Sequence, residues 1–284
     1  MSTGENRRVG QVKEITSLTN PIVKDIRALA MKKFRDQQNA FMAEGLKLVI
    51  DALDLGWTIR TLVFGKSQRG NQAVEKVAAR AVAAGALVLE VSEKVLGAIT
   101  RRDNPQMVLG VFEQRWTTLK QIRPADGDLW VALDRVRDPG NLGTILRTVD
   151  AVGAKGVILV GDTTDPFSVE TVRATMGSVF AVPVAKAGVD AFLAWRKTTD
   201  ARFIGTHLKG SVDYRTVDYA RGAVVLVMGN EQQGLPDALA DACDALIRIP
   251  QAGRADSLNL AVATGVALYE MRRHALPSVG REEQ

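Results

Sequence analysis

The sequence contains little cysteine and histidine. Its 284 residues include one cysteine, Cys243, and two histidines, His207 and His274. A single cysteine excludes an intrachain disulfide, and we expect Cys243 to be a small buried hydrophobic residue. These three residues do not by themselves supply the ligands of a zinc site, and no cluster of metal ligands is evident. We therefore predict no metal site.

Long apolar runs are also missing. No run approaches the ~20 residues that a membrane-spanning helix needs, and the start MSTGENRRVGQVKEITS lacks the apolar core of a secretory signal. We therefore expect a cytoplasmic protein without a membrane segment. Hydrophobic residues make up 46% of the chain, enough for packed cores, and the length favours about two domains.

Three common catalytic motifs are absent. The chain has no G-x-x-x-x-G-K-[ST] phosphate loop, no G-x-G-x-x-G after an early strand and no G-x-S-x-G elbow. These absences weigh against a P-loop enzyme, a Rossmann dinucleotide enzyme, an ordinary Rossmann methyltransferase and an α/β-hydrolase.

The net charge of +5 is unevenly distributed. Residues 1–115 contain 18 lysines and arginines against 12 acidic residues, a net of +6, which leaves −1 for the rest. Because a basic surface suits a phosphate backbone, we expect the first part of the chain to contact nucleic acid. A helix predicted over Val23–Phe34 and the residue after it carry the candidate contacts Lys24, Arg27, Lys32, Lys33 and Arg35.

The pattern of the chain predicts two folded parts. Residues 1–16 are expected to be a polar arm, 17–115 a small α/β or α+β domain, 116–127 a linker and 128–284 a second domain. In the first domain a second helix is predicted over Phe41–Leu55.

The second domain alternates strands with helices, which is typical of a mainly parallel sheet covered by helices on both faces. The predicted strands are Leu129–Leu133, Gly156–Val160, Ala181–Val184, Phe203–Thr206, Val224–Met228 and Ala245–Ile249. The predicted helices are Leu142–Val152, Ser168–Met176, Val189–Lys197, Leu235–Cys243 and a closing helix from Leu258.

Three segments of this domain differ from plain strand–helix connections. In the first, 132–161, a polar loop follows a strand and leads into a helix that places Asn141, a predicted N-cap, six residues before Arg147. In the second, 224–236, an apolar strand runs directly into Gly229, and Glu231 follows at the edge where open α/β sheets bind ligands.

The third segment, 247–273, gives the clearest pattern. A strand is stopped by Pro250, a flexible stretch follows, and Ser257 stands at the predicted N-cap of the closing helix. Ser257 and Asn259 flank Leu258 and are expected to face the same crevice. Each segment alone is compatible with an ordinary turn or helix cap.

Taken together, the segments DPGNLGTILRT, MGNEQQGL and IPQAGRADSLNLAVA resemble the three motifs of the SpoU (TrmH) family of RNA 2′-O-ribose methyltransferases, within the SPOUT superfamily. They occur in the family's order over residues 129–273. The segments NPIVKDIRAL, FMAEGLKLVIDAL and RRDNPQMVLGVF resemble, less specifically, the family's L30e-like substrate-binding domain.

The resemblance implies an α/β domain with a deep trefoil knot at residues 128–284, preceded by an L30e-like RNA-binding domain at 17–115. It implies a homodimer formed through the knotted domain, with S-adenosylmethionine as cofactor, an RNA substrate, and no metal or membrane. Ribosomal RNA is favoured over transfer RNA, by analogy with the rRNA-directed branch of the family.

The resemblance also implies the site residues. Arg147, which also contacts RNA, is expected to hold the phosphate beside the target ribose and to stabilise the developing alkoxide, although the family's arginine is often assigned as the base. Catalytic roles beside it fall on Asn141, Glu231, Ser257 and Asn259. Cofactor contacts fall on Thr206, Leu208, Gly229, Asn230, Gly234, Ile249, Pro250 and Leu258.

Three other functions are weighed against this one. A non-catalytic RNA-binding or ribosome-assembly protein would use the same basic surface without the full set of motif residues. A methyltransferase acting on transfer RNA would share the chemistry. An α/β enzyme with a nucleotide cofactor lacks its phosphate loop.

Overall fold

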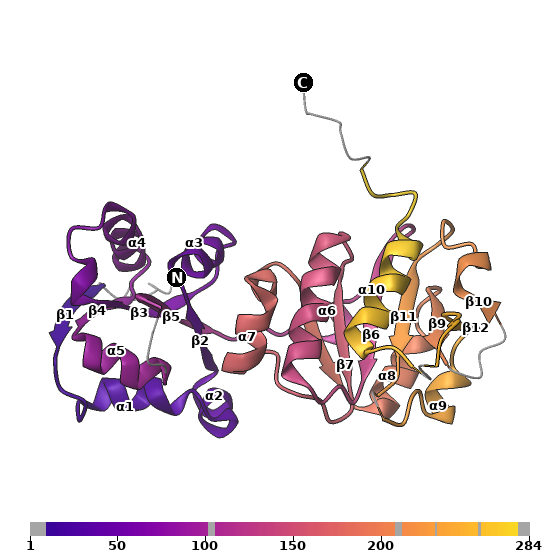
Figure 1. The fold of residues 1–284 in the computed structure, drawn as a ribbon, viewed down its shortest axis with the longest axis horizontal. Coiled ribbons are helices and arrows are strands. Elements are labelled where there is room, and N and C mark those ends of the chain that lie inside the picture. The colour runs from indigo at the N-terminus through magenta and orange to yellow at the C-terminus, as the bar shows by residue number, and fades with distance from the viewer. Residues whose placement is uncertain (1–9, 102–105, 208–211, 231, 255–256, 278–284) are drawn as a thin grey trace, which may run out of the picture. The chain divides into compact units, whose positions relative to one another are not determined.

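The structure, a computed structural model, describes residues 10–101, 106–207, 212–230, 232–254 and 257–277 (Figure 1). The chain divides into two compact units. The first comprises residues 1–114 and 167–180, and the second 115–166 and 181–284. Within the described residues, no helix is long and apolar enough to cross a membrane.

The first unit is built on a five-stranded sheet in the order β1-β4-β3-β5-β2. β1, β4 and β3 are parallel, whereas β5 pairs antiparallel with both of its neighbours. The strands are β1 Gln11–Ile15, β2 Ala40–Glu44, β3 Ile59–Gly65, β4 Leu87–Val91 and β5 Val108–Glu113. The helices are α1 Pro21–Ala28, α2 Lys32–Gln38, α3 Leu46–Asp54, α4 Gln72–Ala83, α5 Glu93–Thr100 and α7 Val169–Thr175.

Helices cover both faces of this sheet. α3 and α4 lie on one face, and α1 and α5 on the other (Figure 1). α7 packs against the edge strand β2, where Arg173 Nη2 lies 2.6 Å from Oε1 of the buried Glu44. The indole of Trp57 donates to the carbonyl of Phe180. These contacts make residues 167–180 part of the first core, which the sequence pattern does not predict.

Two predicted elements of the first unit are wrong, and one strand was missed. The helix predicted over Val23–Phe34 is two helices, α1 and α2. The helix predicted over Phe41–Leu55 begins as β2, because the left-handed Asn39 ends α2 and Gly45, with φ 114°, turns the chain before α3. Part of the predicted polar arm, Gln11–Ile15, is the edge strand β1.

The second unit contains a seven-stranded parallel sheet in the order β10-β12-β9-β11-β6-β7-β8. This confirms the predicted α/β class. The strands are β6 Leu129–Asp134, β7 Gly156–Val160, β8 Val184–Ala187, β9 Arg202–Thr206, β10 Val212–Asp213, β11 Val224–Met228 and β12 Ala245–Arg248. The helices are α6 Pro139–Ala151, α8 Val189–Arg196, α9 Asp237–Ala240 and α10 Leu260–Met271.

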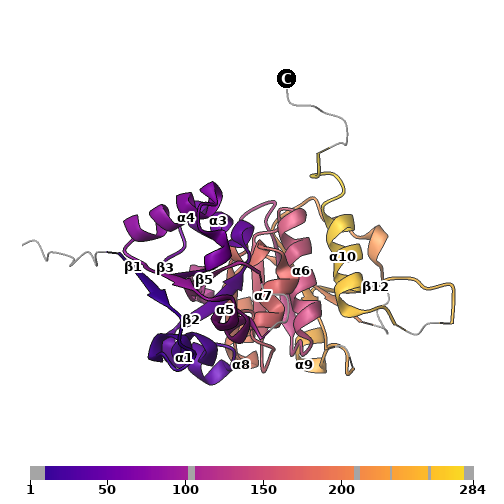
Figure 2. The same ribbon diagram turned by 60° about the vertical axis from the view of Figure 1, so that its left-hand side comes forward.

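Two helix pairs cover the faces of this sheet. α6 and α10 lie side by side on one face, as Figures 1 and 2 both show, and their apolar residues share a core with the strands. α8 and α9 cover the other face, where Phe192, Trp195 and Leu239 are buried. The strands are therefore buried on both sides, which explains their nearly continuous apolar sequences.

Residues 116–127, predicted to be a linker, fall within the second unit. The N–H of Thr117 donates to the carbonyl of Val184 at the edge of the sheet. Ile122 is buried, and its carbonyl accepts a hydrogen bond from the indole of Trp195. The chain first passes from one unit to the other between Gln114 and Arg115, and residues 167–180 return to the first unit.

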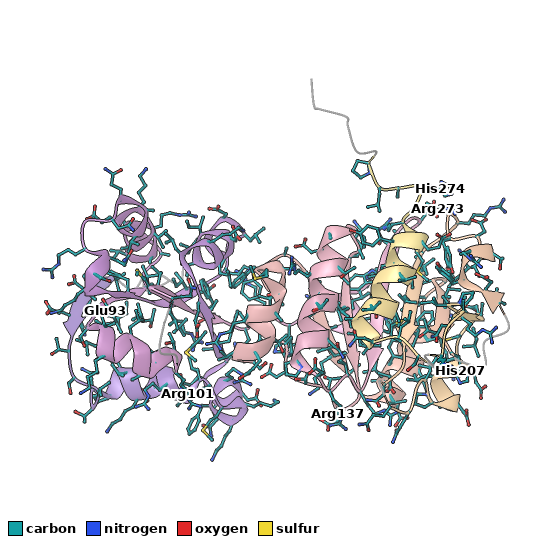
Figure 3. The ribbon with its side chains drawn as sticks, in the orientation of Figure 1. Glu93, Arg101, Arg137, His207, Arg273 and His274 are labelled. Atoms are coloured by element: carbon teal, nitrogen blue, oxygen red, sulfur yellow. The ribbon has the colours of Figure 1, made fainter. Side chains whose placement is uncertain are left out.

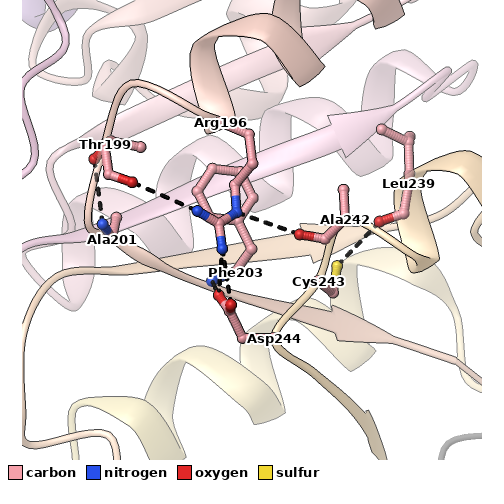
Figure 4. Close-up of polar contacts among 8 residues, drawn as sticks. All are labelled: Arg196, Thr199, Ala201, Phe203, Leu239, Ala242, Cys243 and Asp244. Carbon is pink, nitrogen blue, oxygen red and sulfur yellow. Dashed lines mark hydrogen bonds and ion pairs between the residues drawn. The ribbon is translucent and has the colours of Figure 1, made fainter.

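A polar cluster fixes the start of β9 and the residue before β12 (Figure 4). Arg196 Nη2 lies 2.8 and 2.9 Å from the two carboxylate oxygens of Asp244, and the guanidinium stacks over the ring of Phe203 at 4.5 Å. Asp244 also accepts the N–H of Phe203 at 2.7 Å. In the same cluster Cys243 Sγ lies 3.2 Å from the carbonyl oxygen of Leu239, and burial raises the pKa of the thiol to about 12.

Candidate active site

A cavity of about 780 Å³ lies where β9, β11 and β12 end and α10 begins. Thr206 and His207 line it at the end of β9, Met228 and Gly229 at the end of β11, and Ile249 just after β12. The carboxyl ends of neighbouring parallel strands meet at one edge of a sheet, which is where open α/β sheets bind ligands. The volume falls in the range of small-molecule sites.

One wall of the cavity is the 229–235 turn, whose described residues are 229–230 and 232–235. The N–H of Asn230 donates to the carbonyl of Gly234 at 3.1 Å, and the reverse bond measures 2.9 Å. A Cβ on Gly229 would lie 2.2 Å from the carbonyl carbon of Gly234 and from the nitrogen of Leu235. Glycine is therefore required at 229 by the close approach within the turn itself.

The opposite wall is formed by the chain that enters α10, including Ile249, Ser257 and Leu258. The N-cap of α10 is Asn259, whose Oδ1 accepts the N–H groups of Ala261 and Val262 at 2.9 and 3.2 Å. The predicted cap, Ser257, is wrong, because the helix begins at Leu260, two residues later than expected. Ser257 is exposed in the cavity wall instead.

Asn259 also joins the first and third sequence segments. Its Nδ2 donates to Oδ1 of Asn141 at 2.9 Å, across 118 residues of chain. Asn141 is not the N-cap of α6, as the sequence suggested. Asp138 holds that position and accepts the N–H of Asn141 at 2.6 Å, with Pro139 at the start of the helix. The Asn141 side chain lies in the first turn and is thereby available to Asn259.

Arg147 lies on α6 with its side chain exposed. It is not part of the cavity wall, and it forms no hydrogen bond or ion pair with another described residue. An unpaired cation on the helix that carries Asn141 is available to an anionic ligand such as a phosphate.

The described cavity wall carries little charge. Apolar side chains from Met228, Leu235, Ile247, Leu258 and Leu260 dominate it, beside backbone groups at the strand ends. Charged side chains come from Asp237 and Arg248. Such a surface fits a ligand with an apolar, stacking part and a few hydrogen-bonding groups. No group of three or more described histidines, cysteines, aspartates or glutamates is arranged to hold a metal.

Most predicted cofactor contacts with a described position lie in the cavity wall. These are Thr206, Gly229, Asn230, Gly234, Ile249 and Leu258. Pro250 is not in the wall, whereas Leu208 and Glu231 lie outside the described residues. The motifs did not identify His207, Met228 or Gln233 as cavity residues. His207 directly follows β9, Met228 ends β11 and Gln233 lies in the 229–235 turn, and such positions at the ends of strands are a usable signal for a ligand site.

Figure 3 shows where labelled side chains of the second unit lie. Arg137, which follows β6, and His207, which follows β9, lie toward the same end of this unit. Arg273 and His274, at the end of α10, lie toward the opposite end. The strand ends and the polar loop of the first segment thus occupy one side of the unit.

The basic residues proposed to contact RNA differ in exposure. Lys24, Lys32 and Lys33 are exposed and Arg27 is half-buried. Arg35 does not fit the prediction: it is only 3% exposed, and its Nη1 donates to the carbonyls of Leu29 and Ala30, each at 2.9 Å. The Arg35 side chain stabilises the connection between α1 and α2 and is too buried to contact RNA.

Two family models match the chain. The SpoU rRNA Methylase family matches residues 128–269, and the MRM3-like substrate binding domain matches residues 20–110. The chain is 31% identical to the 23S rRNA (guanosine(2553)-2′-O)-methyltransferase RlmP of Bacillus subtilis, over 92% of this chain and 100% of that protein.

Solved structures give the same result. The AdoMet-bound rRNA methyltransferase from Sinorhizobium meliloti shares 66% identity at a TM-score of 0.89, covering 94% of this chain and 99% of that one. The SpoU methyltransferase AviRb from Streptomyces viridochromogenes, in complex with AdoMet, shares 28% identity at a TM-score of 0.79, covering 90% and 99%. The chain therefore belongs to the SpoU rRNA methylase family.

Proposed function

We propose that this protein transfers a methyl group from S-adenosylmethionine to a ribose 2′-hydroxyl of ribosomal RNA. The hydrogen bond between Asn259 and Asn141 carries the proposal, because it brings the helix of Arg147 to the wall of the cavity. Two relatives of the chain are 23S rRNA 2′-O-methyltransferases, which supports the substrate. Two similar solved structures contain AdoMet, which supports the cofactor.

The cavity suits the cofactor. Backbone groups of Gly229, Ile249 and Leu258 would hold its adenine and methionine portions, and Thr206 would line the same pocket. Carbonyl groups at strand ends and apolar walls match an adenine ring and a thioether chain. When bound, the cofactor supplies a methyl group on a positively charged sulfonium.

The protein's own residues position the RNA. Methyl transfer is an in-line displacement, so orientation of the ribose hydroxyl is a large part of the task. A guanidinium stays protonated at neutral pH, and Arg147 therefore holds the neighbouring phosphate and stabilises negative charge developing on the attacking oxygen. Asn141 and Asn259 orient Arg147 and the substrate, whereas Ser257 and Glu231 shape the cofactor pocket and tie the motifs together.

The first unit binds the structured RNA. Lys24, Lys32 and Lys33 are exposed cations on α1 and α2, which suit contacts to the phosphate backbone. Arg27 on the same α1 helix is the fourth proposed contact. We propose a cytoplasmic location, because ribosomal RNA is the proposed substrate.

We also propose that the protein is a homodimer formed through a knotted second unit. Support for the dimer comes from α10, where the large apolar side chains of Val262 and Tyr269 are each 52% exposed. A helix with an uncovered apolar face is a typical protein interface. Light scattering should give twice the chain mass, and a monomer at micromolar concentration would contradict the dimer. An experimental electron-density map in which the chain of the second unit passes through no loop would contradict the knot.

Two measurements test the proposed function. Calorimetry should show S-adenosylmethionine binding at one site per chain, and mapping of ribose methylations in cells with and without the gene should reveal a lost mark in ribosomal RNA. Absence of cofactor binding would favour a non-catalytic RNA-binding or ribosome-assembly protein. A mark lost from transfer RNA would contradict the proposed substrate.

A further inference from the structure

Arg135 has an unusual backbone conformation. It follows β6 directly, and its φ of 46° lies in the left-handed region that favours glycine. The other described non-glycine residues with positive φ are Asn39, Arg101 and Met176, and each of them ends a helix, where this conformation is common. Arg135 lies at no helix end, so contacts around it must hold the conformation.

Those contacts join β6 to the 229–235 turn. The carbonyl of Arg135 accepts a hydrogen bond from Nδ2 of Asn230 at 2.8 Å. Its guanidinium donates from Nη1 to Oε1 of Gln233 at 2.9 Å and from Nε to Oδ2 of Asp134 at 2.9 Å. Both Asn230 and Gln233 line the cavity, so a single residue is bonded to the cavity wall through its backbone and its side chain.

The carboxylate of Asp134 also binds the guanidinium of Arg135. The Asp134 side chain is fully buried, and its Oδ1 has no hydrogen-bond partner among the described residues. Burial raises the pKa of this carboxyl, against the opposing effect of Arg135. Asp134 is therefore bonded through Oδ2 to Arg135, and this contact restricts the rotamers of the arginine.

Gly161 leaves the space that the Arg135 side chain uses. A Cβ on Gly161 would lie 3.2 Å from Cγ of Arg135, and Gly161 has a φ of 74°. The N–H of Arg135 also donates to the carbonyl of Val160 at 2.9 Å. The end of β7 thus accommodates both the backbone and the side chain of Arg135.

We propose that Arg135 is a positioning residue that holds the 229–235 turn in the shape that binds S-adenosylmethionine. This inference rests on the proposed function of the cavity. Arg135 does not line the cavity, so it acts through Gln233 and Asn230. Its loss leaves the chemistry in place and allows the turn to move, which weakens cofactor binding more than it slows methyl transfer.

Calorimetric titration with S-adenosylmethionine tests the proposal on the full chain. R135A should raise Kd about tenfold, as expected for the loss of one charge-assisted hydrogen bond. With rRNA as substrate, the KM for the cofactor should rise while kcat at saturating cofactor stays within about threefold. R135K, which keeps the charge but not the fork geometry, should fall between R135A and the native protein.

Gln233 gives a second and milder variant, because its side chain is exposed and its removal should not affect folding. Q233A should also weaken binding, and the R135A/Q233A double variant should bind no more weakly than R135A. R137A is the matched control. Arg137 lies in the same loop but pairs with Asp162 at 2.8 Å, so the Kd of R137A for S-adenosylmethionine should equal that of the native protein.

Unchanged Kd in R135A or Q233A, or effects that multiply in the double variant, would overturn the role of Arg135. If R135A does not fold, R135K takes its place, and an R135K Kd equal to that of the native protein would overturn the role of Arg135. Failure of the native protein to bind the cofactor would instead overturn the proposed function, so the two failures are distinguishable.

Discussion

Asn259 and Asn141 form a hydrogen bond of 2.9 Å between Nδ2 and Oδ1, although 118 residues separate them in the chain. The Oδ1 of Asn259 is used at the same time as the cap of α10. One side chain therefore determines both where α10 begins and how it is joined to α6. This dual use explains why an asparagine, with a donor and an acceptor, occupies the position.

Substitution of Asn259 should separate these two roles. N259D keeps the capping oxygen and loses the donor to Asn141, so stability should be retained while methyl transfer falls at least about tenfold through misplacement of α6 groups. N259A loses both the capping oxygen and the donor to Asn141, and its free energy of unfolding should be lower than that of N259D by ~1 kcal/mol. Denaturant titration and transfer assays measure the two effects. Equal transfer rates in N259D and the native protein would contradict the role of the bond.

Gly229 should tolerate no side chain. In G229A the new Cβ would lie 2.2 Å from backbone atoms of the 229–235 turn, which must open. We expect S-adenosylmethionine to bind at least about tenfold more weakly by calorimetry. G188A is the control, since a Cβ there has no neighbour within 4 Å. Wild-type affinity in G229A would show that the turn does not form the cofactor site.

The ion pair between Arg173 and Glu44 should stabilise the first unit. The Glu44 side chain is 3% exposed, so R173A removes a cation that lies 2.6 Å from a buried carboxylate. We expect the free energy of unfolding to fall by about 2–4 kcal/mol in a denaturant titration. R137A removes an exposed ion pair with Asp162 and should cost under about 1 kcal/mol. Equal effects of the two substitutions would contradict this account of residues 167–180.

Cys243 should be unreactive in the folded protein. With a pKa of about 12, about one thiol in ten thousand is ionised at pH 8. A disulfide reagent at pH 8 should label one thiol per chain only after denaturation. Because the folded pKa lies above the ordinary 9.0, this group should lower stability as pH rises from about 9 to 12, and C243A should remove that contribution. Cys243 is half-buried, and rapid labelling of the native protein would contradict the protection of its thiol.

The sequence predicted most strands of the second unit because they are apolar on both faces, although β8 begins at Val184, where the predicted strand Ala181–Val184 ends. It failed at Phe41–Leu55, where only Glu44 and Gly45 stand between the apolar residues of β2 and those of α3, and the conformation of Gly45 turns the chain. The placement of residues 167–180 in the first core also has no local signal, since it depends on contacts such as Trp57 with Phe180.

The candidate site was predicted from motifs rather than from geometry. The resemblance to the SpoU motifs indicated Asn141 and Asn259, but not that they bond to each other or that Asp138 is the true cap of α6. Arg135 was missed because its role depends on a left-handed backbone and on a turn about 95 residues away. Neither is encoded in a local pattern.

We propose that the exposed Arg147 on α6 acts on RNA beside a separate cofactor cavity. The most direct test compares R147A with the native protein in two assays, the Kd for S-adenosylmethionine and the rate of single-turnover methyl transfer to rRNA. We predict an unchanged Kd and a rate lower by at least about a hundredfold, because Arg147 does not line the cavity. Full transfer activity in R147A would contradict the account.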